Sequence, residues 1–261
     1  MTHDYINEGE RLDYVNEDIR LIQSTKGLTF GTDAYMLAAF IRSEGKNSVA
    51  AELGSGTGII SLLCAAKDKL KKIYAIEIQE SFARLCERNI NINGLSDKVT
   101  SVCADIREIT PDRFERELDV VFANPPYMKV NAGKRNEHDE KFIARHEVCG
   151  NIYDFCGAAS RLLRFGGLFY CVYRPDRMTE LFAALREKGF EAKRMTLVSA
   201  DSETPPSIML VEAKKGASPG LKITPTLLLH KSGDNKSGKR ASTEAAEKVY
   251  ESCSFEHLGK G

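Results

Sequence analysis

Three features that would each indicate a class of protein are missing from this sequence. The 37 Lys and Arg residues equal the 37 Asp and Glu residues in number, so no overall charge draws the chain toward nucleic acid or a membrane surface. The seven cysteines are scattered without a Cys-x-x-Cys pair, which argues against a zinc site and against a disulfide framework. There is no apolar run of transmembrane length and no apolar stretch of the signal-peptide type near the first residue. We therefore expect a cytoplasmic protein without a metal or a membrane partner.

What the sequence does contain is a regular alternation of short apolar runs and amphipathic stretches. The runs predict strands at 48–53, 73–78, 99–104, 118–122, 168–173, 192–198 and 208–213. The stretches predict helices at 34–42, 59–67, 80–93, 153–163 and 178–188, the first capped by Thr32 or Asp33. Such alternation predicts an α/β protein with a Rossmann-like, doubly wound sheet of seven mostly parallel strands. Since no helix separates the last two strands, we expect an antiparallel strand at the edge.

The same pattern divides the chain into three parts. Residues 1–29 are polar and mixed and form an N-terminal extension, in which we expect a short hairpin around 19–30. Residues 30–215 form the α/β domain, and residues 216–261 form a basic tail that we expect to be flexible, with a short helix at 244–250. Between Lys214 and Arg240 there are seven basic residues and one acid, so this tail either stays solvated or orders on a polyanion.

The tetrapeptide Asn124-Pro125-Pro126-Tyr127 directly follows one of the expected strands. The prolines remove two backbone N–H donors, and Pro125 favours an extended conformation at Asn124. The resulting rigid corner offers carbonyl oxygens and an aromatic ring, which suits a planar amine. An ordinary Pro-Pro turn with a packed tyrosine explains the same four residues, so the motif alone leaves both interpretations open.

A glycine-rich segment, ELGSGTG at 52–58, stands where a nucleotide-binding loop is expected, between the first strand and the first helix of the alternation. Glycine permits positive φ angles and a close approach of the backbone to a ligand. The spacing is GxGxG rather than the GxGxxG of dinucleotide-binding loops, and the Gly-Lys-Ser/Thr of a P-loop is missing. We therefore expect Gly54, Gly56 and Gly58 to bind a nucleoside without a pyrophosphate.

Three acidic residues stand at the ends of three successive expected strands. Glu77 is placed to accept hydrogen bonds from both hydroxyls of a ribose. Asp105, or the backbone of Ile106, is placed to contact an adenine ring, and Glu52 suits a neighbouring ammonium or sulfonium group. Taken singly, Glu77 is equally a solvated carboxylate and Asp105 a loop cap. Taken together with the loop, the three acids predict S-adenosylmethionine as the cofactor.

These motifs resemble those of class I methyltransferases with an Asn-Pro-Pro-Tyr corner, over about residues 30–214. Further likeness points to the family that methylates N6 of adenine 37 in a valine tRNA. It is carried by FGTDA at 30–34, ELGSGTGIISL at 52–62 and ARHE at 144–147, and by RLD at 11–13 and LIQ at 21–23, which resemble the family's leader segment. The tail after Lys215 matches no pattern of that family.

The resemblance implies an S-adenosylmethionine-dependent enzyme with a tRNA substrate. The catalytic residues that it implies are Asn124, Pro125, Pro126 and Tyr127. The residues that it implies to contact the cofactor are Glu52, Gly54, Gly56, Gly58, Glu77, Ile78, Asp105, Ile106 and Asn124. The polar segment 128–147 offers Lys129, Lys134, Arg135 and Arg145 to RNA phosphates. Acids at 137, 139, 140 and 147 make a solvated loop an equally good interpretation of that segment.

Other functions are compatible with the same corner. Methyltransferases that act on a glutamine of release factors share it, although they usually carry a longer N-terminal helical domain. DNA adenine and ribosomal guanine methylation are further alternatives, and Tyr127 favours adenine over guanine. A non-catalytic nucleoside-binding protein is the remaining alternative, but binding alone does not require Asn124.

Overall fold

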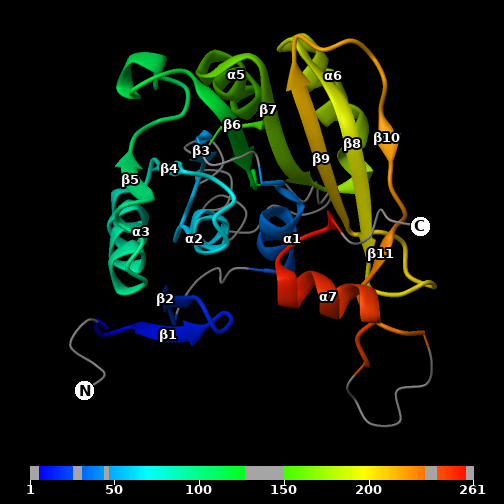
Figure 1. The fold of residues 1–261 in the computed structure, drawn as a ribbon, viewed down its shortest axis with the longest axis horizontal. Helices are drawn as coiled ribbons and strands as arrows, with labels where there is room; N and C mark the ends of the chain where they lie inside the picture. The colour runs from blue at the N-terminus through cyan, green and yellow to red at the C-terminus, as the bar shows by residue number, and fades with distance from the viewer. Residues whose placement is uncertain (1–5, 26–30, 44–46, 127–149, 233–239, 257–261) are drawn as a thin grey trace, which may run out of the picture.

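The computed structural model describes residues 6–25, 31–43, 47–126, 150–232 and 240–256 (Figure 1). In this part of the chain a central sheet has the strand order β10-β8-β9-β7-β6-β3-β4-β5, with β11 also paired to β8. Its parallel strands are β3 (Val49–Leu53), β4 (Lys72–Glu77), β5 (Val99–Cys103), β6 (Leu118–Ala123) and β7 (Leu163–Tyr173). The prediction of a doubly wound, mostly parallel sheet is confirmed.

The antiparallel part of the sheet is the pair β8 (Phe190–Ser199) and β9 (Ile208–Lys215). β9 runs antiparallel to both of its neighbours, β7 and β8. Two short strands, β10 (Lys222–Ile223) and β11 (Leu227–Leu228), extend the sheet beyond β8 and run parallel to it. The antiparallel strand therefore lies between β7 and β8, and the sheet gains two strands that the apolar runs do not predict.

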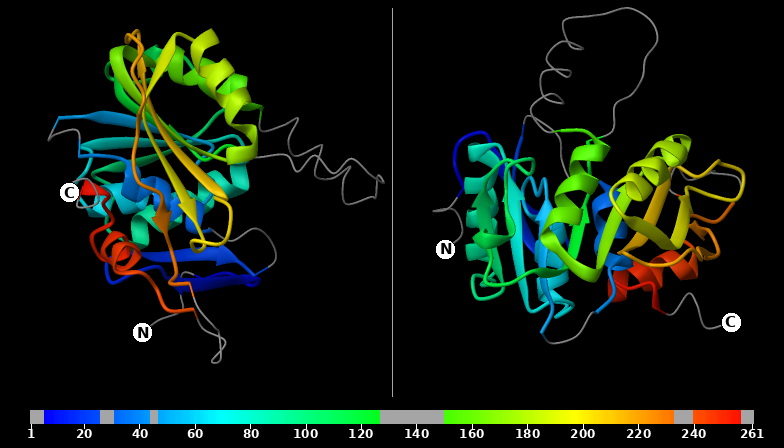
Figure 2. Two further views of the ribbon diagram at one scale, coloured as in Figure 1. Left: turned by 90° about the vertical axis from the view of Figure 1, so that its right-hand side faces the viewer. Right: turned by 90° about the horizontal axis from the view of Figure 1, so that it is seen from above.

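Helices cover both faces of the sheet, as the view from above in Figure 2 shows. One face packs against α1 (Thr32–Phe40), α2 (Ile59–Ala66), α3 (Glu80–Ile92) and α7 (Glu244–Ser252). The other packs against α5 (Ile152–Leu162) and α6 (Met178–Glu187). Successive residues of a strand point to opposite faces, so Ala50 belongs to the first hydrophobic core and Ala51 to the second. Among the described residues no helix is long and apolar enough to cross a membrane.

An N-terminal hairpin, β1 (Glu10–Tyr14) and β2 (Arg20–Ser24), forms a separate two-stranded sheet. It lies nearer the N-terminus than expected, because the turn is made at Asn16, whose side chain accepts from the backbone N–H groups of Asp18 and Ile19. The buried Asn89 of α3 holds the hairpin: it accepts from the Ile22 N–H at 2.7 Å and donates to the Ile22 carbonyl at 3.1 Å. The hairpin is thereby fixed to the helix that follows β4.

The basic segment after residue 216 differs from the expected flexible tail wherever it is described. Residues 217–232 include β10 and β11, and residues 240–256 include α7, which packs against α1. The Tyr35 and Tyr250 rings lie 5.1 Å apart, and Phe255 meets Phe40 edge to face at 5.8 Å. A few apolar residues spaced along a basic segment are enough to pack one face of α7 against α1, which overall composition does not reveal.

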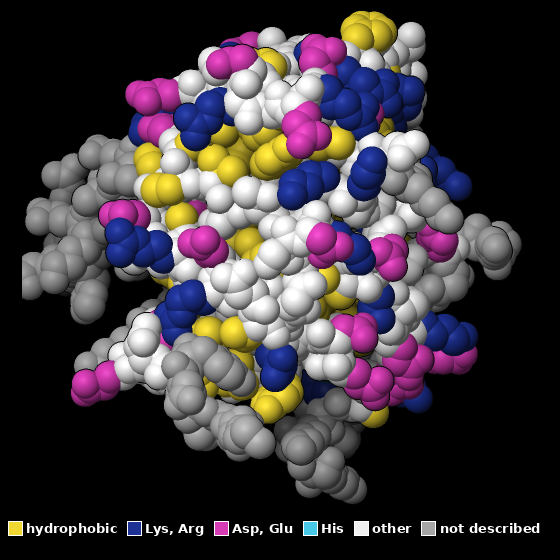
Figure 3. Space-filling view, turned by 60° about the vertical axis from the view of Figure 1, so that its left-hand side comes forward, with side chains coloured by type: hydrophobic (Ala, Val, Ile, Leu, Met, Phe, Trp, Pro, Cys, Tyr) yellow, Lys and Arg dark blue, Asp and Glu magenta, His cyan; other side chains and the backbone are white. Residues whose placement is uncertain are grey.

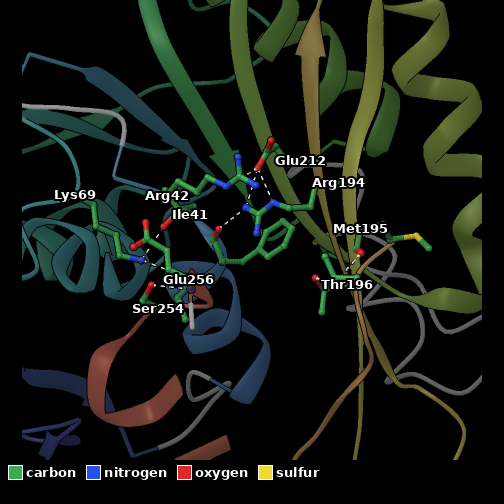
Figure 4. A network of polar contacts seen from close by, with 12 residues as sticks. Ile41, Arg42, Lys69, Arg194, Met195, Thr196, Glu212, Ser254 and Glu256 are labelled. Atoms are coloured by element: carbon green, nitrogen blue, oxygen red, sulfur yellow. Dashed lines mark hydrogen bonds and ion pairs between the residues drawn. The ribbon is translucent and has the colours of Figure 1, made fainter. Parts of the chain in front are cut away.

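Two buried cations hold the C-terminal end of α1 (Figure 4). The Lys69 ammonium donates to the carbonyls of Ala38, Ala39 and Ile41 at 2.6, 3.2 and 2.7 Å. The Arg194 guanidinium donates to the Phe40 carbonyl at 2.8 Å and lies 3.7 Å from the centre of the Phe40 ring. Positive charge at this end of a helix is favourable because the last carbonyls are unpaired and partly negative. α1 is therefore held firmly beneath the sheet.

Candidate active site

The carboxyl ends of β3, β4 and β6 bring the expected site residues to one edge of the sheet. β3 lies between β4 and β6, with Leu53 opposite both Ile76 and Ala123. Gly54, Glu77 and Asn124 each follow that row by one residue, so they emerge side by side. The structure thus brings together the glycine-rich loop, the acid after it and the proline corner, which are up to about seventy residues apart in sequence.

All three glycines of the loop have the left-handed backbone conformation, with φ of 69° at Gly54, 53° at Gly56 and 84° at Gly58. This conformation costs other residues about 1–2 kcal/mol, so it accounts for the glycine spacing. At Gly58 there is a second reason, because an added Cβ would lie 2.5 Å from the sulfur of Cys86. The loop is a preformed turn whose backbone is open to a ligand at Gly54, which is exposed.

Glu77 is tied to this loop by its side chain. One carboxylate oxygen accepts from the Gly56 N–H at 2.9 Å, and the other accepts from the Gln79 N–H at 2.9 Å. A carboxylate accepts about four hydrogen bonds, so these two bonds leave capacity for ribose hydroxyls. Ile78, the next residue, is half-buried. The position supports the expected ribose-binding role of Glu77.

Glu52 lies beneath the loop and is 2% exposed. Its Oε2 atom accepts from the backbone N–H of Ser61 at 3.0 Å and from the Ser61 hydroxyl at 2.5 Å. Burial raises the pKa of Glu52 to about 8, and the nearby charge of Glu77 adds to the rise, while the bonds from Ser61 oppose it. Glu52 therefore holds a proton at neutral pH until a cation comes close. Sequence reasoning missed Ser61, which the helix after the loop places opposite Glu52.

Asp105 follows β5 and is paired with Arg107, which sequence reasoning also missed. The guanidinium donates to the carboxylate at 2.5 and 2.9 Å, and the Arg107 N–H donates to it at 2.8 Å. The hydrogen bond from Arg107 holds the pKa of Asp105 below its usual value. The Ile106 side chain is buried, and its carbonyl accepts from Arg161 at 2.7 Å. An adenine ring at this edge would therefore meet a carboxylate that is already paired.

The proline corner begins at the end of β6. Asn124 is half-buried, Pro125 is buried and Pro126 is exposed. The side-chain amide of Asn124 donates through Nδ2 to Asp33 Oδ2 at 3.1 Å. Asp33 is the second residue of α1, whose N-cap is Gly31 without a side-chain cap, so Asp33 and Thr32 do not cap α1 as expected.

Several expected site residues lie outside the described part of the chain. These are Tyr127, Lys129, Lys134, Arg135 and Arg145. Their roles stay predictions. The contact between Asp33 and Asn124 joins residues 91 positions apart, and the only signal for it in the sequence is that both belong to motifs.

A cavity of about 710 Å³ is lined by other residues. It is lined by the hairpin turn at 15–18, by the start of α1, and by Tyr250 and Glu251 near the end of α7. None of the expected cofactor-binding residues lines it, so we place the active site at the glycine-rich loop. In the described residues no cluster of His, Cys, Asp and Glu side chains has the arrangement of a metal site.

The residues at the sheet edge fit S-adenosylmethionine. Gly54 and Gly56 form a left-handed turn, a conformation that residues with a Cβ disfavour. Glu77 lies beside this turn, where its carboxylate can accept from a ribose. Glu52 lies beneath it and is an acid that a nearby cation would cause to lose its proton. The surface in Figure 3 carries side chains of both charge signs, in keeping with the balanced composition.

The chain resembles known proteins in sequence and in fold. A model of the TRM5/TYW2 methyltransferase domain matches residues 38–148. The fold resembles that of a predicted O-methyltransferase of Agrobacterium tumefaciens, with a TM-score of 0.67 and 21% identity over 85% of this chain and 97% of the other. It also resembles TYW2 of M. jannaschii, solved in complex with AdoMet, with a TM-score of 0.53 and 17% identity over 80% and 86%. Together the sequence and the fold resemble those of class I S-adenosylmethionine-dependent methyltransferases.

Within that class the chain resembles the tRNA1(Val) (adenine(37)-N6)-methyltransferases. The enzyme of that name from Vibrio campbellii is 24% identical over 192 residues, which cover 73% of this chain and 77% of the relative. The one from Porphyromonas gingivalis is 24% identical over 215 residues, covering 80% and 84%. The family resemblance that FGTDA and the neighbouring motifs predict is confirmed.

Proposed function

We propose that this protein methylates N6 of adenine 37 in a valine tRNA, with S-adenosylmethionine as the methyl donor. The observation that carries the proposal is the placement of Asn124 one strand away from the glycine-rich loop, with its Nδ2 atom turned to a carboxylate. Its Oδ1 atom is thereby turned away from Asp33. The names of the curated relatives support the substrate. On this proposal tRNA is the partner and the cytoplasm the compartment.

The chemistry asks little of the chain beyond alignment. S-adenosylmethionine supplies a methyl carbon that is already activated by its positively charged sulfur. The N6 amine is a weak nucleophile because its lone pair is delocalised into the adenine ring. Asn124 Oδ1 and the Pro125 carbonyl accept from the two N–H groups of the amine, which favours a pyramidal nitrogen with its lone pair directed at the methyl group.

The base itself is held by the rest of the corner. Tyr127 stacks on the adenine, a contact worth about 1–3 kcal/mol per base in comparable sites. Lys129, Lys134, Arg135 and Arg145 contact RNA phosphates beside it. Because a base in an anticodon loop is already unpaired, its extrusion costs little. The amine proton becomes acidic after methylation, so no strong base is needed.

The experiment is nucleoside mass spectrometry of purified valine tRNA from cells with and without the gene. We expect N6-methyladenosine to disappear on deletion and to return with the wild-type gene but not with Asn124→Ala at equal protein level. Unchanged tRNA together with a loss of 14 mass units from a release factor would replace the proposed substrate by a protein glutamine. Unchanged tRNA and unchanged release factors would refute the proposal.

A further inference from the structure

The contact between Asp33 and Asn124 bears on which atom of the Asn124 amide faces the substrate. The amide has two ends of similar size, an oxygen that accepts and a nitrogen that donates. Methylation requires the oxygen at the amine, because an NH2 group there would place donors against donors. A rotation of about 180° around one side-chain bond exchanges the two ends, so the orientation of the amide is assigned from the hydrogen-bonding character of a partner.

Asp33 removes this ambiguity. A carboxylate only accepts hydrogen bonds, so the amide end that faces it must be Nδ2, and the distance from Nδ2 to Asp33 Oδ2 is 3.1 Å. The opposite orientation would place Asn124 Oδ1 against a carboxylate oxygen at a similar distance. A buried or half-buried contact between two acceptors is unfavourable because neither oxygen has a hydrogen to donate, and this keeps one orientation in large excess.

The position of Asp33 is itself well determined. It lies in the first turn of α1, where a negative charge is favourable, and Lys69 and Arg194 hold the other end of the helix. Residues 34–40, which follow Asp33, are all buried. Gly31 leaves room for the carboxylate, because a Cβ there would lie 2.6 Å from Asp33 Oδ1. The sheet carries Asn124 and the helix beneath it carries Asp33, so two rigid elements meet at this hydrogen bond.

We propose that Asp33 is the positioning residue of the methyl transfer, which orients the Asn124 amide so that Oδ1 faces the target amine. The inference rests on the proposed function, because the orientation matters only if Asn124 accepts from an amine. It gives a role to FGTDA, the motif that resembles the family but contains no group that reacts.

The first test separates turnover from binding. Asp33→Ala should lower kcat about 10- to 100-fold, the range found when a group that orients a functional side chain from behind is removed, and should leave KM for tRNA and the Kd of S-adenosylmethionine within about threefold. The matched control is Glu244→Ala, which removes an exposed first-turn acid from α7, and it should leave all three constants unchanged. Equal losses in kcat and in cofactor affinity would assign Asp33 a merely structural role.

The second test exchanges the two partners. Asn124→Asp places two carboxylates in contact and should abolish turnover. The double variant Asp33→Asn with Asn124→Asp restores one donor facing one carboxylate, and residue 124 then presents oxygen in either orientation. We expect the double variant to recover at least about tenfold over Asn124→Asp alone, as for directly coupled neighbours. A double variant that is no better than the single one contradicts the inference.

A third measurement needs neither substrate nor activity. In protein labelled with ¹⁵N only at asparagine, the side-chain resonance of Asn124 is identified by its loss in Asn124→Ala. Asp33→Ala should shift that resonance, and an unshifted one means that the hydrogen bond does not form in solution.

If Asp33→Ala does not fold, Gly31→Ala is the alternative variant. It displaces the Asp33 carboxylate and should also lower kcat. A wild-type enzyme inactive on tRNA refutes the proposed function, whereas full activity in both variants refutes only the role of Asp33.

Discussion

Two glutamates of this protein are buried to nearly the same extent but are compensated in different ways. Glu212 on β9 is 5% exposed and lies against two arginines, 2.7 Å from Arg194 and 3.7 Å from Arg42 (Figure 4). Glu52 at the end of β3 is 2% exposed, and the hydrogen bonds that it accepts from described residues come from Ser61, which is neutral. The charge of Glu212 is therefore balanced by arginines of the same chain, whereas Glu52 has no such cation among the described residues and holds a proton instead.

We propose that the difference separates a structural charge, at Glu212, from a charge held for a ligand, at Glu52. Removing an ion from water costs several kcal/mol, and at Glu212 the two cations of the chain offset that cost. At Glu52 the cost appears instead as a pKa raised to about 8. On the proposed binding mode, the ammonium and the sulfonium of S-adenosylmethionine lie near Glu52 and bring the missing positive charge.

The largest effect that this comparison predicts is at Arg194. Arg194→Met leaves Glu212 buried with only the more distant Arg42, and we expect the free energy of unfolding to fall by about 3–5 kcal/mol. Urea denaturation followed by circular dichroism measures it. The double variant with Glu212→Gln should recover most of the loss, and a single-variant loss below about 1 kcal/mol would contradict the structural role of the pair.

The second effect is the pH dependence of stability that Glu52 causes. Its pKa is about 8 in the folded protein against a usual 4.5, so between those values the folded state holds one more proton than the unfolded state. The stability that this group contributes is complete below pH 4.5 and is lost as pH rises toward 8, by roughly 2–3 kcal/mol between pH 5 and pH 7. Glu52→Gln should lack this component. Parallel stability curves for wild type and variant would contradict the raised pKa.

The third effect is a proton released when the cofactor binds. A cation near Glu52 favours the ionised form of Glu52, so cofactor binding at pH 7 should release up to one proton. For the same reason the affinity for the cofactor should fall, by at most about tenfold per pH unit, as the pH is lowered below 7. Calorimetry in buffers of different ionisation enthalpy detects the proton, and Glu52→Gln is the control. S-adenosylhomocysteine keeps the ammonium but not the sulfonium, so it shows which charge is responsible. Equal heats in all buffers would contradict a ligand-compensated Glu52.

The smallest effect concerns the glycine-rich loop. Gly56→Ala and Gly94→Ala both place a Cβ on a left-handed residue with no atom within 4 Å, at φ of 53° and 65°. Each should lose about 1 kcal/mol of stability from backbone strain alone. Only Gly56→Ala should also weaken cofactor binding, because Gly94 ends α3 away from the site. Equal cofactor affinity in the two variants would remove Gly56 from the binding loop.

Most of the fold is predictable because the signals are local. Apolar runs and glycine stops give the bounds of β3 to β9 and their helices mostly within one or two residues, and the glycine spacing identifies three left-handed positions. Contacts between distant segments are different. The Asp33–Asn124 bond and the packing of Tyr35 on Tyr250 join residues 91 and 215 positions apart. No periodicity encodes them, so the contact that FGTDA makes and the packing of α7 against α1 emerge only from the structure.

The measurement that tests the account most directly is methylation of a valine tRNA transcript by the purified protein, read by nucleoside mass spectrometry. The account predicts N6-methyladenosine with adenine at position 37, none with guanine there, and a rate about 10²–10³-fold lower for Asn124→Ala, whose cofactor affinity stays within a few-fold. A methyl group on another atom, or wild-type rates in Asn124→Ala, would contradict it.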